Sequence, residues 1–281
     1  MKKSVIMIPV LVFAAVSTIV YGQRYSAKQR EEMDSYQLSV SDSENDKTEV
    51  TEDDYLIDAS EETDPQKKLA YYESNQESLS LYEYLDYISM KKETVSLAYY
   101  GDITMQEDWV AYLNNTIDES VSGDLAVIDQ TYSDYDSYEL YIQQTTQSLT
   151  SEAPDLILFG LPAHPDQRRD MGLEETEEFM GYVLDRLASS EDTKLIMLEP
   201  YPIINEINQI NSRSLDYRSY LRRMQSVGED YDLTVLPLHS VFEEQALDDS
   251  LTDYYKEDGE LNDKGSDHVF SILDDLFSEE L

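Results

Sequence analysis

From Thr94 to the C-terminus, short apolar runs alternate with longer stretches of helical periodicity, and this alternation constrains the fold more than any other feature. The apolar runs are Val95–Tyr100, Leu125–Ile128, Leu156–Phe159, Leu195–Leu198 and Leu233–Leu236. Helical patterns lie near residues 106–118, 136–149, 173–189, 213–228 and 266–279. Such alternation is typical of βαβ units, whose strands form a parallel sheet that is buried on both faces. The sequence therefore predicts an α/β fold: a three-layer α/β/α sandwich around a five-stranded, mostly parallel sheet.

The first 23 residues resemble a membrane-spanning segment. Lys2 and Lys3 precede an uncharged, largely apolar run from Ser4 to Gln23. Twenty helical residues at ~1.5 Å each span the ~30 Å hydrocarbon core of a bilayer. The positive start favours a cytoplasmic N-terminus, so we expect a single-pass protein of the cell membrane with an extracellular C-terminal domain. A cleaved signal peptide, which would release a secreted protein, is the alternative.

Two further segments separate this anchor from the α/β domain. Residues 31–63 contain thirteen Asp or Glu and a single lysine, Lys47. Such a stretch buries too little apolar surface to offset its chain entropy, so residues 24–63 are predicted to be a disordered acidic stalk. Residues 64–93 have an imperfect helical stripe and are predicted to be a helical extension that packs on the domain of residues 94–281.

The composition excludes several classes of function. The chain has 60 acidic and 20 basic residues and a formal net charge of -40, so we expect no binding to nucleic acid. It has no cysteine, which excludes disulfides, thiolate nucleophiles and lipidation at cysteine. No dinucleotide-binding or P-loop glycine pattern is present, and the three histidines lack metal-site spacing. We therefore expect neither a cofactor nor a metal ion.

In a parallel sheet, ligands bind beyond the carboxyl ends of the strands. This rule selects four segments and, typically, the segment before the last helix. They are Gly101–Thr104, Thr131–Ser137, Gly160–Asp166, Pro200–Ile204 and Glu257–Gly265.

At these places the chain resembles the GDSL/SGNH hydrolase family, whose fold is flavodoxin-like. The sequence Gly101-Asp102-Ile103-Thr104 is similar to the family's Gly-Asp-Ser-x-Thr block, either with Ile103 at the serine position or with the serine deleted. The strand that ends at Gly160 is similar to the one before the Gly-x-Asn-Asp block, but residues 161–166 contain no asparagine. The most specific likeness is Glu257-Asp258-Gly259-Glu260-Leu261-Asn262-Asp263-Lys264-Gly265, which is close to Asp-Gly-x-His-x-Asn-x-x-Gly.

The resemblance assigns roles to particular residues. It places Glu257 at the family's catalytic aspartate and Glu260 at its catalytic histidine. Isoleucine has no nucleophilic atom, and Thr104 is the nearest hydroxyl that might substitute, although threonine there is more often a helix N-cap. At none of these positions do we therefore expect the chemical group that the family's catalytic mechanism uses. The predicted binding residues are Gly101, Asp102, His164, Asp166 and Asn262.

Three functions follow as hypotheses. The first is an SGNH-like protein with impaired catalysis that binds a cell-envelope glycan or a surface protein. The second is an active esterase, deacetylase or acyltransferase that acts on envelope carbohydrate through an altered site. The third is a structural surface protein. The 23 tyrosines suit glycan contact, since a tyrosine ring offers an apolar face and a hydroxyl, but packing explains them equally simply.

Overall fold

A computed structural model describes residues 64–190, 192–246 and 250–280. The predicted membrane anchor (residues 1–23) and acidic stalk (residues 24–63) lie outside these residues. Within them, none of the helices is both long enough and apolar enough to cross a bilayer.

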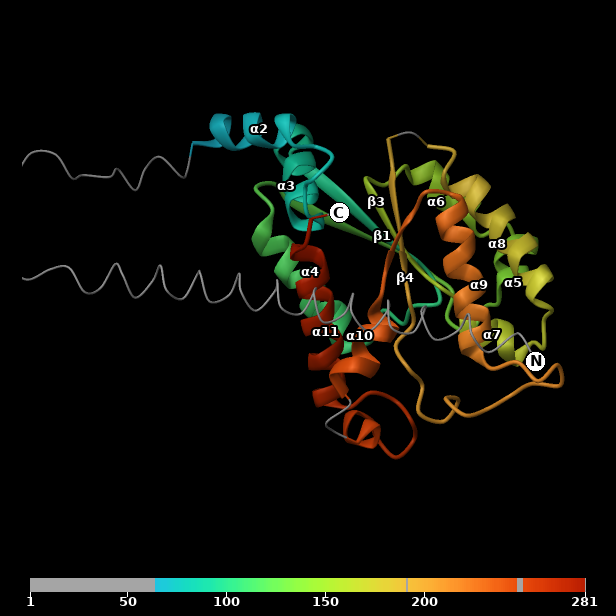
Figure 1. The fold of residues 1–281 in the computed structure, drawn as a ribbon. Helices are drawn as coiled ribbons and strands as arrows, with labels where there is room; N and C mark the ends of the chain where they lie inside the picture. Colours follow the sequence, from blue (N-terminus) through green and yellow to red (C-terminus); the bar gives the residue numbers. More distant parts are fainter. Residues whose placement is uncertain (1–63, 191, 247–249, 281) are drawn as a thin grey trace, which may run out of the picture. The chain divides into compact units, whose positions relative to one another are not determined.

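Five strands form one sheet, as predicted, and every pair of neighbours is parallel (Figure 1). Their order across the sheet is β2-β1-β3-β4-β5. At the carboxyl end of β1, Gly101 is in register with Thr131 of β2 and with Gly160 of β3. The strands are β1 Thr94–Gly101, β2 Asp124–Thr131, β3 Leu156–Gly160, β4 Lys194–Leu198 and β5 Thr234–Leu236.

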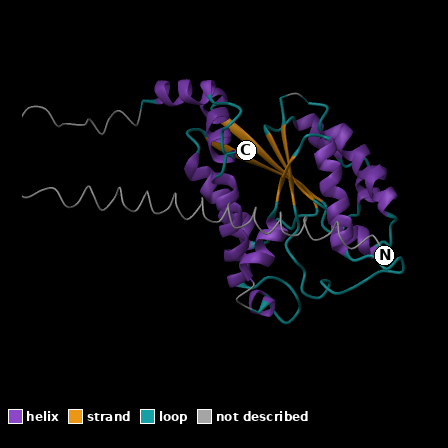
Figure 2. Cartoon of the chain, in the orientation of Figure 1, coloured by secondary structure: helices purple, strands orange, loops and turns teal. Residues whose placement is uncertain are grey.

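Helices cover both faces of this sheet, which confirms the predicted three layers (Figures 1 and 2). One face is covered by α3 Leu81–Lys92, α4 Asp108–Ser120, α10 Leu238–Gln245 and α11 Asp263–Ser278. The other is covered by α5 Ser137–Ile142, α6 Thr146–Glu152, α7 Ala163–Arg168, α8 Leu173–Leu187 and α9 Tyr217–Asp230. Helix α2 Pro65–Ser74 packs on α3, and a short 3-10 helix, η3 Leu251–Tyr254, precedes α11.

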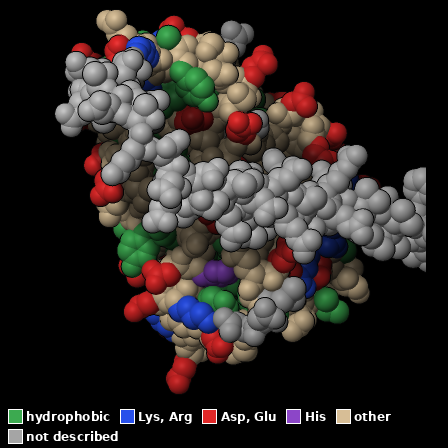
Figure 3. Space-filling model, turned by 60° about the vertical axis from the view of Figure 1, so that its left-hand side comes forward, with side chains coloured by type: hydrophobic (Ala, Val, Ile, Leu, Met, Phe, Trp, Pro, Cys, Tyr) green, Lys and Arg blue, Asp and Glu red, His purple; other side chains and the backbone are tan. Residues whose placement is uncertain are grey.

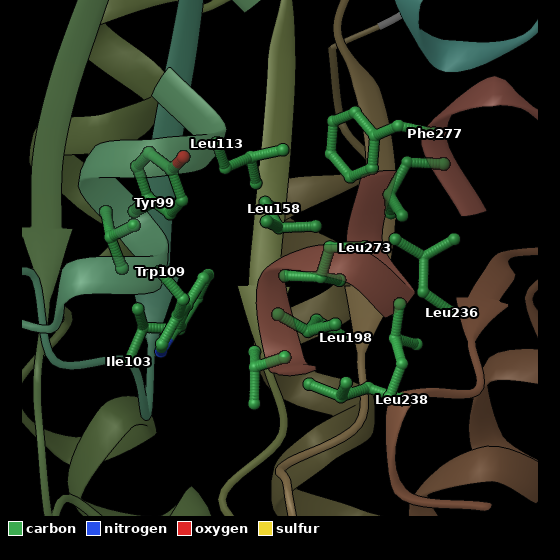
Figure 4. Close-up of a cluster of buried hydrophobic side chains, with 14 of the residues drawn as sticks. Tyr99, Ile103, Trp109, Leu113, Leu158, Leu198, Leu236, Leu238, Leu273 and Phe277 are labelled. Atoms are coloured by element: carbon green, nitrogen blue, oxygen red, sulfur yellow. The ribbon is translucent and has the colours of Figure 1, made fainter. Parts of the chain in front are cut away.

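The two cores follow from side-chain alternation along the strands. In β1, Leu97 and Tyr99 enter the cluster under α4 and α11, whereas Ala98 and Tyr100 enter the cluster under α8 and α9. Figure 4 shows part of the first cluster, in which Tyr99 lies near Leu113 of α4 and next to its register partner Leu158 of β3. Because β1 is buried on both faces, it fixes the position of the loop that follows it.

The helical prediction for residues 64–93 differs in detail from the structure. The structure has two helices there, α2 and α3, because Ser80 begins α3 with a capping box. The Ser80 side chain accepts a hydrogen bond from the amide of Glu83, and the Glu83 side chain accepts one from the amide of Ser80. Leu81 and Leu85 of α3 are buried in the first core cluster, so this helix is part of the core of the α/β domain.

Other helix boundaries also differ from the prediction. The stretch 136–149 is divided into α5 and α6, because Gln144 adopts a left-handed backbone conformation with φ of 55°. Helix α7, which contains Pro165, is not among the predicted helices. Proline is tolerated there because it lies in the first turn, where the helix needs no amide donor.

Candidate functional site

A cavity of about 150 Å³ opens at the carboxyl ends of β1, β3 and β4, where the strand-end rule places a ligand site. Its walls come from the loops after these strands, from the loop after β2 and from α7. The lining residues are Asp102, Ile103, Thr104, Glu107, Trp109, Ser133, Asp134, Gly160, His164, Arg168, Leu198, Glu199, Pro200, Tyr201, Ile203 and Leu238. Of the residues predicted to form the site, Asp102, Ile103, Thr104 and His164 are brought together here.

Two glycines set the backbone at the base of the cavity. Gly101 has a φ of 81°, and a Cβ atom there would lie 2.6 Å from the carbonyl oxygen of Gly160. A Cβ atom on Gly160 would in turn lie 2.5 Å from Cγ1 of Ile103. Glycine is needed at both positions, since any other residue would force the two strand ends apart.

Ile103 occupies the position that the family resemblance assigns to a nucleophile. Its side chain is 5% exposed and belongs to the first core cluster. Figure 4 shows it beside Trp109, at the edge of that cluster. The position is therefore filled by a packed apolar side chain.

The neighbouring hydroxyls are bonded to each other and to the backbone. Ser133 donates a hydrogen bond to the carbonyl oxygen of Ile103 at 2.9 Å, and its Oγ lies 3.2 Å from Oγ1 of Thr104. Because the Ser133 proton is used in this way, the Thr104 hydroxyl donates to Ser133. In the described part of the chain, no hydrogen bond joins Thr104 to a histidine or a carboxylate.

His164 is the most distinctive polar group of the cavity. It is 1% exposed and lies in the first turn of α7. Nδ1 lies 2.8 Å from Oε2 of Glu206, and the ring stacks on Tyr217 with centroids 4.1 Å apart. Nε2 is buried and has no hydrogen-bond partner among the described residues. A ligand in the cavity would supply that partner.

Glu206 and Arg168 extend this cluster to the rim. Arg168 is held by Oε1 of Glu206 at 2.8 Å and by Asp134 at 2.6 Å. Burial alone would raise the pKa of Glu206. Hydrogen bonds from His164 and Arg168 lower this pKa by more than burial raises it, so the pKa lies below its usual range. Glu206 is therefore a carboxylate that orients two cavity residues.

Three carboxyl groups in the cavity have raised pKa values because burial disfavours their charged forms. The pKa of Asp102 is raised to about 6, despite a hydrogen bond from the amide of Asp134. The pKa of Glu107 and that of Glu199 are raised as well. Glu107 accepts a hydrogen bond from Tyr201 at 2.6 Å, and Glu199 accepts one from the amide of His239 at 3.0 Å.

The other histidines also have partners that the sequence did not reveal. Nε2 of His239 lies 2.7 Å from the hydroxyl of Tyr217. Burial lowers the pKa of His239 to about 4. His268 is half-buried and stacks on Tyr254 with centroids 4.9 Å apart.

Five predicted site residues do not line the cavity: Gly101, described above, and four others. Asp166 is fully buried and accepts hydrogen bonds from Ser137 and Thr176, so it ties the start of α5 to α8. Asn262 is the N-cap of α11 and accepts from the amide of Gly265 at 2.9 Å. Glu257 is exposed, and Glu260 is exposed and pairs with Lys256 at 3.3 Å.

Several cavity residues were not singled out from the sequence. Ser133 and Tyr201 fall within the strand-end segments that the topological rule selected, so the rule located them without identifying them. Glu107, Glu199 and Arg168 lie outside those segments. A carboxylate directly after a buried strand, as at Glu199, is a signal that would have found one of them.

Comparison with known proteins supports the fold. No protein-family model and no curated protein matches the sequence. LAE5, an alpha/beta hydrolase enzyme from the metagenome of Lake Arreo, matches with a TM-score of 0.52 and 17% identity over 65% of this chain and 94% of that chain. A protein described as a GDSL-like lipase from Parabacteroides merdae matches with a TM-score of 0.50 and 13% identity over 65% and 95%.

A catalytic mutant of an acetylxylan esterase from Geobacillus stearothermophilus matches with a TM-score of 0.51 and 13% identity over 65% of this chain and 94% of that chain. At these identities the likeness concerns the fold. The described α/β domain therefore has the fold of the GDSL/SGNH lipases and esterases.

Proposed function

We propose that this chain is a cell-surface protein that uses the SGNH fold to bind an acetylated cell-envelope glycan without hydrolysing it. The observation that carries the proposal is Ile103, a buried apolar residue at the position of the family's nucleophile. The cavity has a mixed polar and apolar lining, and one of its polar groups, Nε2 of His164, is buried without a hydrogen-bond partner among the described residues.

The groups needed for ester hydrolysis are not assembled around the cavity. A hydroxyl nucleophile requires a base within hydrogen-bond reach, and the Thr104 hydroxyl is directed to Ser133. Glu260, at the position of the family's histidine, is paired with Lys256 and does not line the cavity. The isoleucine at position 103 is therefore only one of several departures from the arrangement that ester hydrolysis needs.

The chemistry of the cavity suits a neutral, hydroxyl-rich ligand. Asp102, Glu107 and Glu199 have raised pKa values, and a carboxyl group that takes up a proton donates as well as accepts hydrogen bonds. Trp109 and Tyr201 add aromatic surface. A cavity of roughly 150 Å³ accommodates a group of about the size of benzene, so an acetyl substituent fits.

The overall charge supports an uncharged ligand outside the cell. The face in Figure 3 carries many acidic and few basic side chains, and the net charge of -40 repels polyanions. The N-terminal run behind Lys2 and Lys3 supports a location on the membrane with the domain outside. A fold shared with an acetylxylan esterase supports an acetylated glycan as the ligand class.

Calorimetric titration of the full chain with an acetylated xylo-oligosaccharide tests the proposal. We expect saturable binding, no release of acetate, and no turnover of 4-nitrophenyl acetate above buffer. His164→Phe keeps the ring stack on Tyr217 but removes both nitrogens, so it should weaken binding about tenfold. The absence of saturable binding would contradict the proposal.

An active esterase with an altered site is the second candidate. It is favoured by the presence of Thr104, a buried imidazole and the orienting Glu206 around one cavity. The reaction would need Thr104 to turn from Ser133 toward Nε2 of His164. Ester turnover that Thr104→Ala and His164→Phe each abolish would establish this candidate and overturn the first.

A further inference from the structure

A second hollow lies beside the loop that follows β2, at the turn between α5 and α6. Its volume is about 440 Å³, which is within the usual range for ligand sites. No charged side chain lines it, although the chain has 60 acidic residues. The lining residues are Tyr132, Gln143, Gln144, Thr145, Gln147, Ser148 and Ser151.

Three glutamines dominate this surface. Gln143, Gln144 and Gln147 are exposed, and in the part of the chain that the structure describes no side-chain hydrogen bond ties their carboxamides to a neighbour. A carboxamide both donates and accepts, and this pattern matches sugar hydroxyls. A cation would find no carboxylate among the lining residues, and an anion would find no positive charge.

The turn that presents these glutamines is held from below. The hydroxyl of Tyr100, in β1, lies 2.7 Å from Oγ1 of Thr145, which also donates to the carbonyl of Leu140 at 2.9 Å. Gln144 itself has a φ of 55°, a left-handed conformation that residues other than glycine and asparagine seldom adopt. The buried contacts of Thr145 therefore fix an unusual turn on which the carboxamides are displayed.

The hollow and the strand-end cavity share one loop. Tyr132 lines the hollow, and the next two residues, Ser133 and Asp134, line the cavity. The amide of Tyr132 donates to the carbonyl of Gly101 at 2.8 Å, which fixes this loop against the end of β1. The two sites are therefore lined by consecutive residues of one loop, whose Cα atoms are ~3.8 Å apart.

We propose that this hollow is a second carbohydrate subsite, which binds an uncharged sugar unit of the glycan whose acetyl group enters the strand-end cavity. The subsite rests on the proposed glycan-binding function. Its ligand is a neutral pyranose or furanose unit, recognised through hydroxyls by the three carboxamides and by Tyr132.

Chain-length dependence of binding tests the subsite. The full chain is titrated with acetylated xylobiose and with acetylated xylopentaose. We expect the longer probe to bind about tenfold more tightly, since it alone reaches both sites. The triple variant Gln143→Ala, Gln144→Gly and Gln147→Ala removes the carboxamides but keeps the turn, because glycine accepts a positive φ. It should abolish the advantage of the longer probe and leave xylobiose binding unchanged.

Gln245→Ala is the matched control, since Gln245 is an exposed glutamine on α10, outside both sites. It should retain the full advantage of the longer probe. Equal affinities for both probes in the unmodified chain would overturn the subsite alone. Binding of neither probe would overturn the proposed function as well. Retention of the chain-length advantage by the triple variant would also overturn the subsite.

Discussion

The strand-end cavity and the segment from Glu257 to Gly265 differ in how their polar groups are used. In the cavity, Nε2 of His164 is buried without a partner, and the carboxyl groups have raised pKa values. In the segment, the side chain of Asn262 accepts from the amide of Gly265 and donates to two backbone carbonyls. The cavity therefore contains a buried nitrogen without a partner among the described residues, whereas the segment uses its polar groups to begin a helix.

This difference bears on which part of the resemblance to the hydrolase family is visible in the sequence. The Leu-Asn-x-x-Gly sequence before α11 is the most recognisable family signal in the chain, and here it has a role in folding. The position of the nucleophile has no such role, so it accepts an apolar residue. A motif that is read as evidence of catalysis is therefore strongest where its residues also build the backbone.

The largest expected effect is that of Gly265→Ala. A Cβ atom there would lie 2.2 Å from the carbonyl oxygen of Tyr254, which also accepts a hydrogen bond from the amide of Asn262. We expect a loss of about 3 kcal/mol in the free energy of unfolding, measured by urea denaturation. Glycan affinity of the folded fraction should not change.

Gly181→Ala, in α8, is the matched control for this substitution. Its Cβ atom would meet only the hydroxyl of Tyr231, at 3.6 Å. It should stabilise the protein by about 0.5–1 kcal/mol, since alanine favours a helix over glycine. If both alanine variants behaved alike, steric contact would not be the reason for glycine at position 265.

The second prediction concerns Asp166, which was predicted to bind ligand but is buried two residues from His164. Burial raises its pKa from 3.8 to about 7. Between these values the folded protein holds a proton that the unfolded chain releases, so stability falls as the pH rises from about 4 to about 7. Asp166→Asn should remove this part of the pH dependence, because the amide does not titrate.

Urea denaturation at several pH values measures this difference. Asp118→Asn, at an exposed position of α4, should leave the pH profile unchanged. A profile of the Asp166 variant that parallels the unmodified protein would assign the pH dependence to other groups. Glycan binding that disappears in this variant while its fold is intact would move Asp166 from the structural residues to the cavity.

Asn262→Ala should have a smaller effect. It removes the N-cap of α11 and two bonds to the carbonyls of Asp253 and Tyr255, at a cost of about 1–2 kcal/mol in unfolding free energy. Asn262→Asp keeps the capping oxygen and should lose less. Thermal unfolding and glycan titration of the same variants distinguish a cap from a binding residue. Loss of a cap lowers the melting temperature and leaves the glycan affinity unchanged.

The smallest effect is expected for Glu260→Gln. Exposed ion pairs such as that of Glu260 with Lys256 contribute little, so neither the melting temperature nor the glycan affinity should change measurably. A marked loss of glycan affinity would show that the position which the resemblance assigns to the family's histidine takes part in binding. The comparison between cavity and segment would then fail.

The sequence predicts the sheet well because all five strands contain apolar runs. The runs are most conspicuous in β1, β3 and β4, which are largely buried, whereas the edge strand β2 is only partly buried. The break at Gln144 is not predictable in this way, because glutamine has no preference for a left-handed conformation. The fit of Ile103 against Trp109 and the contact of His164 with Glu206 depend on tertiary packing between separate elements. The cavity was therefore predictable in place but not in its polar contacts.

The two glycines at the strand ends have a consequence for redesign. Since Gly101 and Gly160 keep β1 and β3 in close contact without side chains, the path of the backbone does not depend on which residue occupies position 103. A substitution at position 103 would therefore change the side chains around the cavity more than the course of the strands. A new nucleophile would require changes to the surrounding side chains, while the main chain beneath them already has its shape.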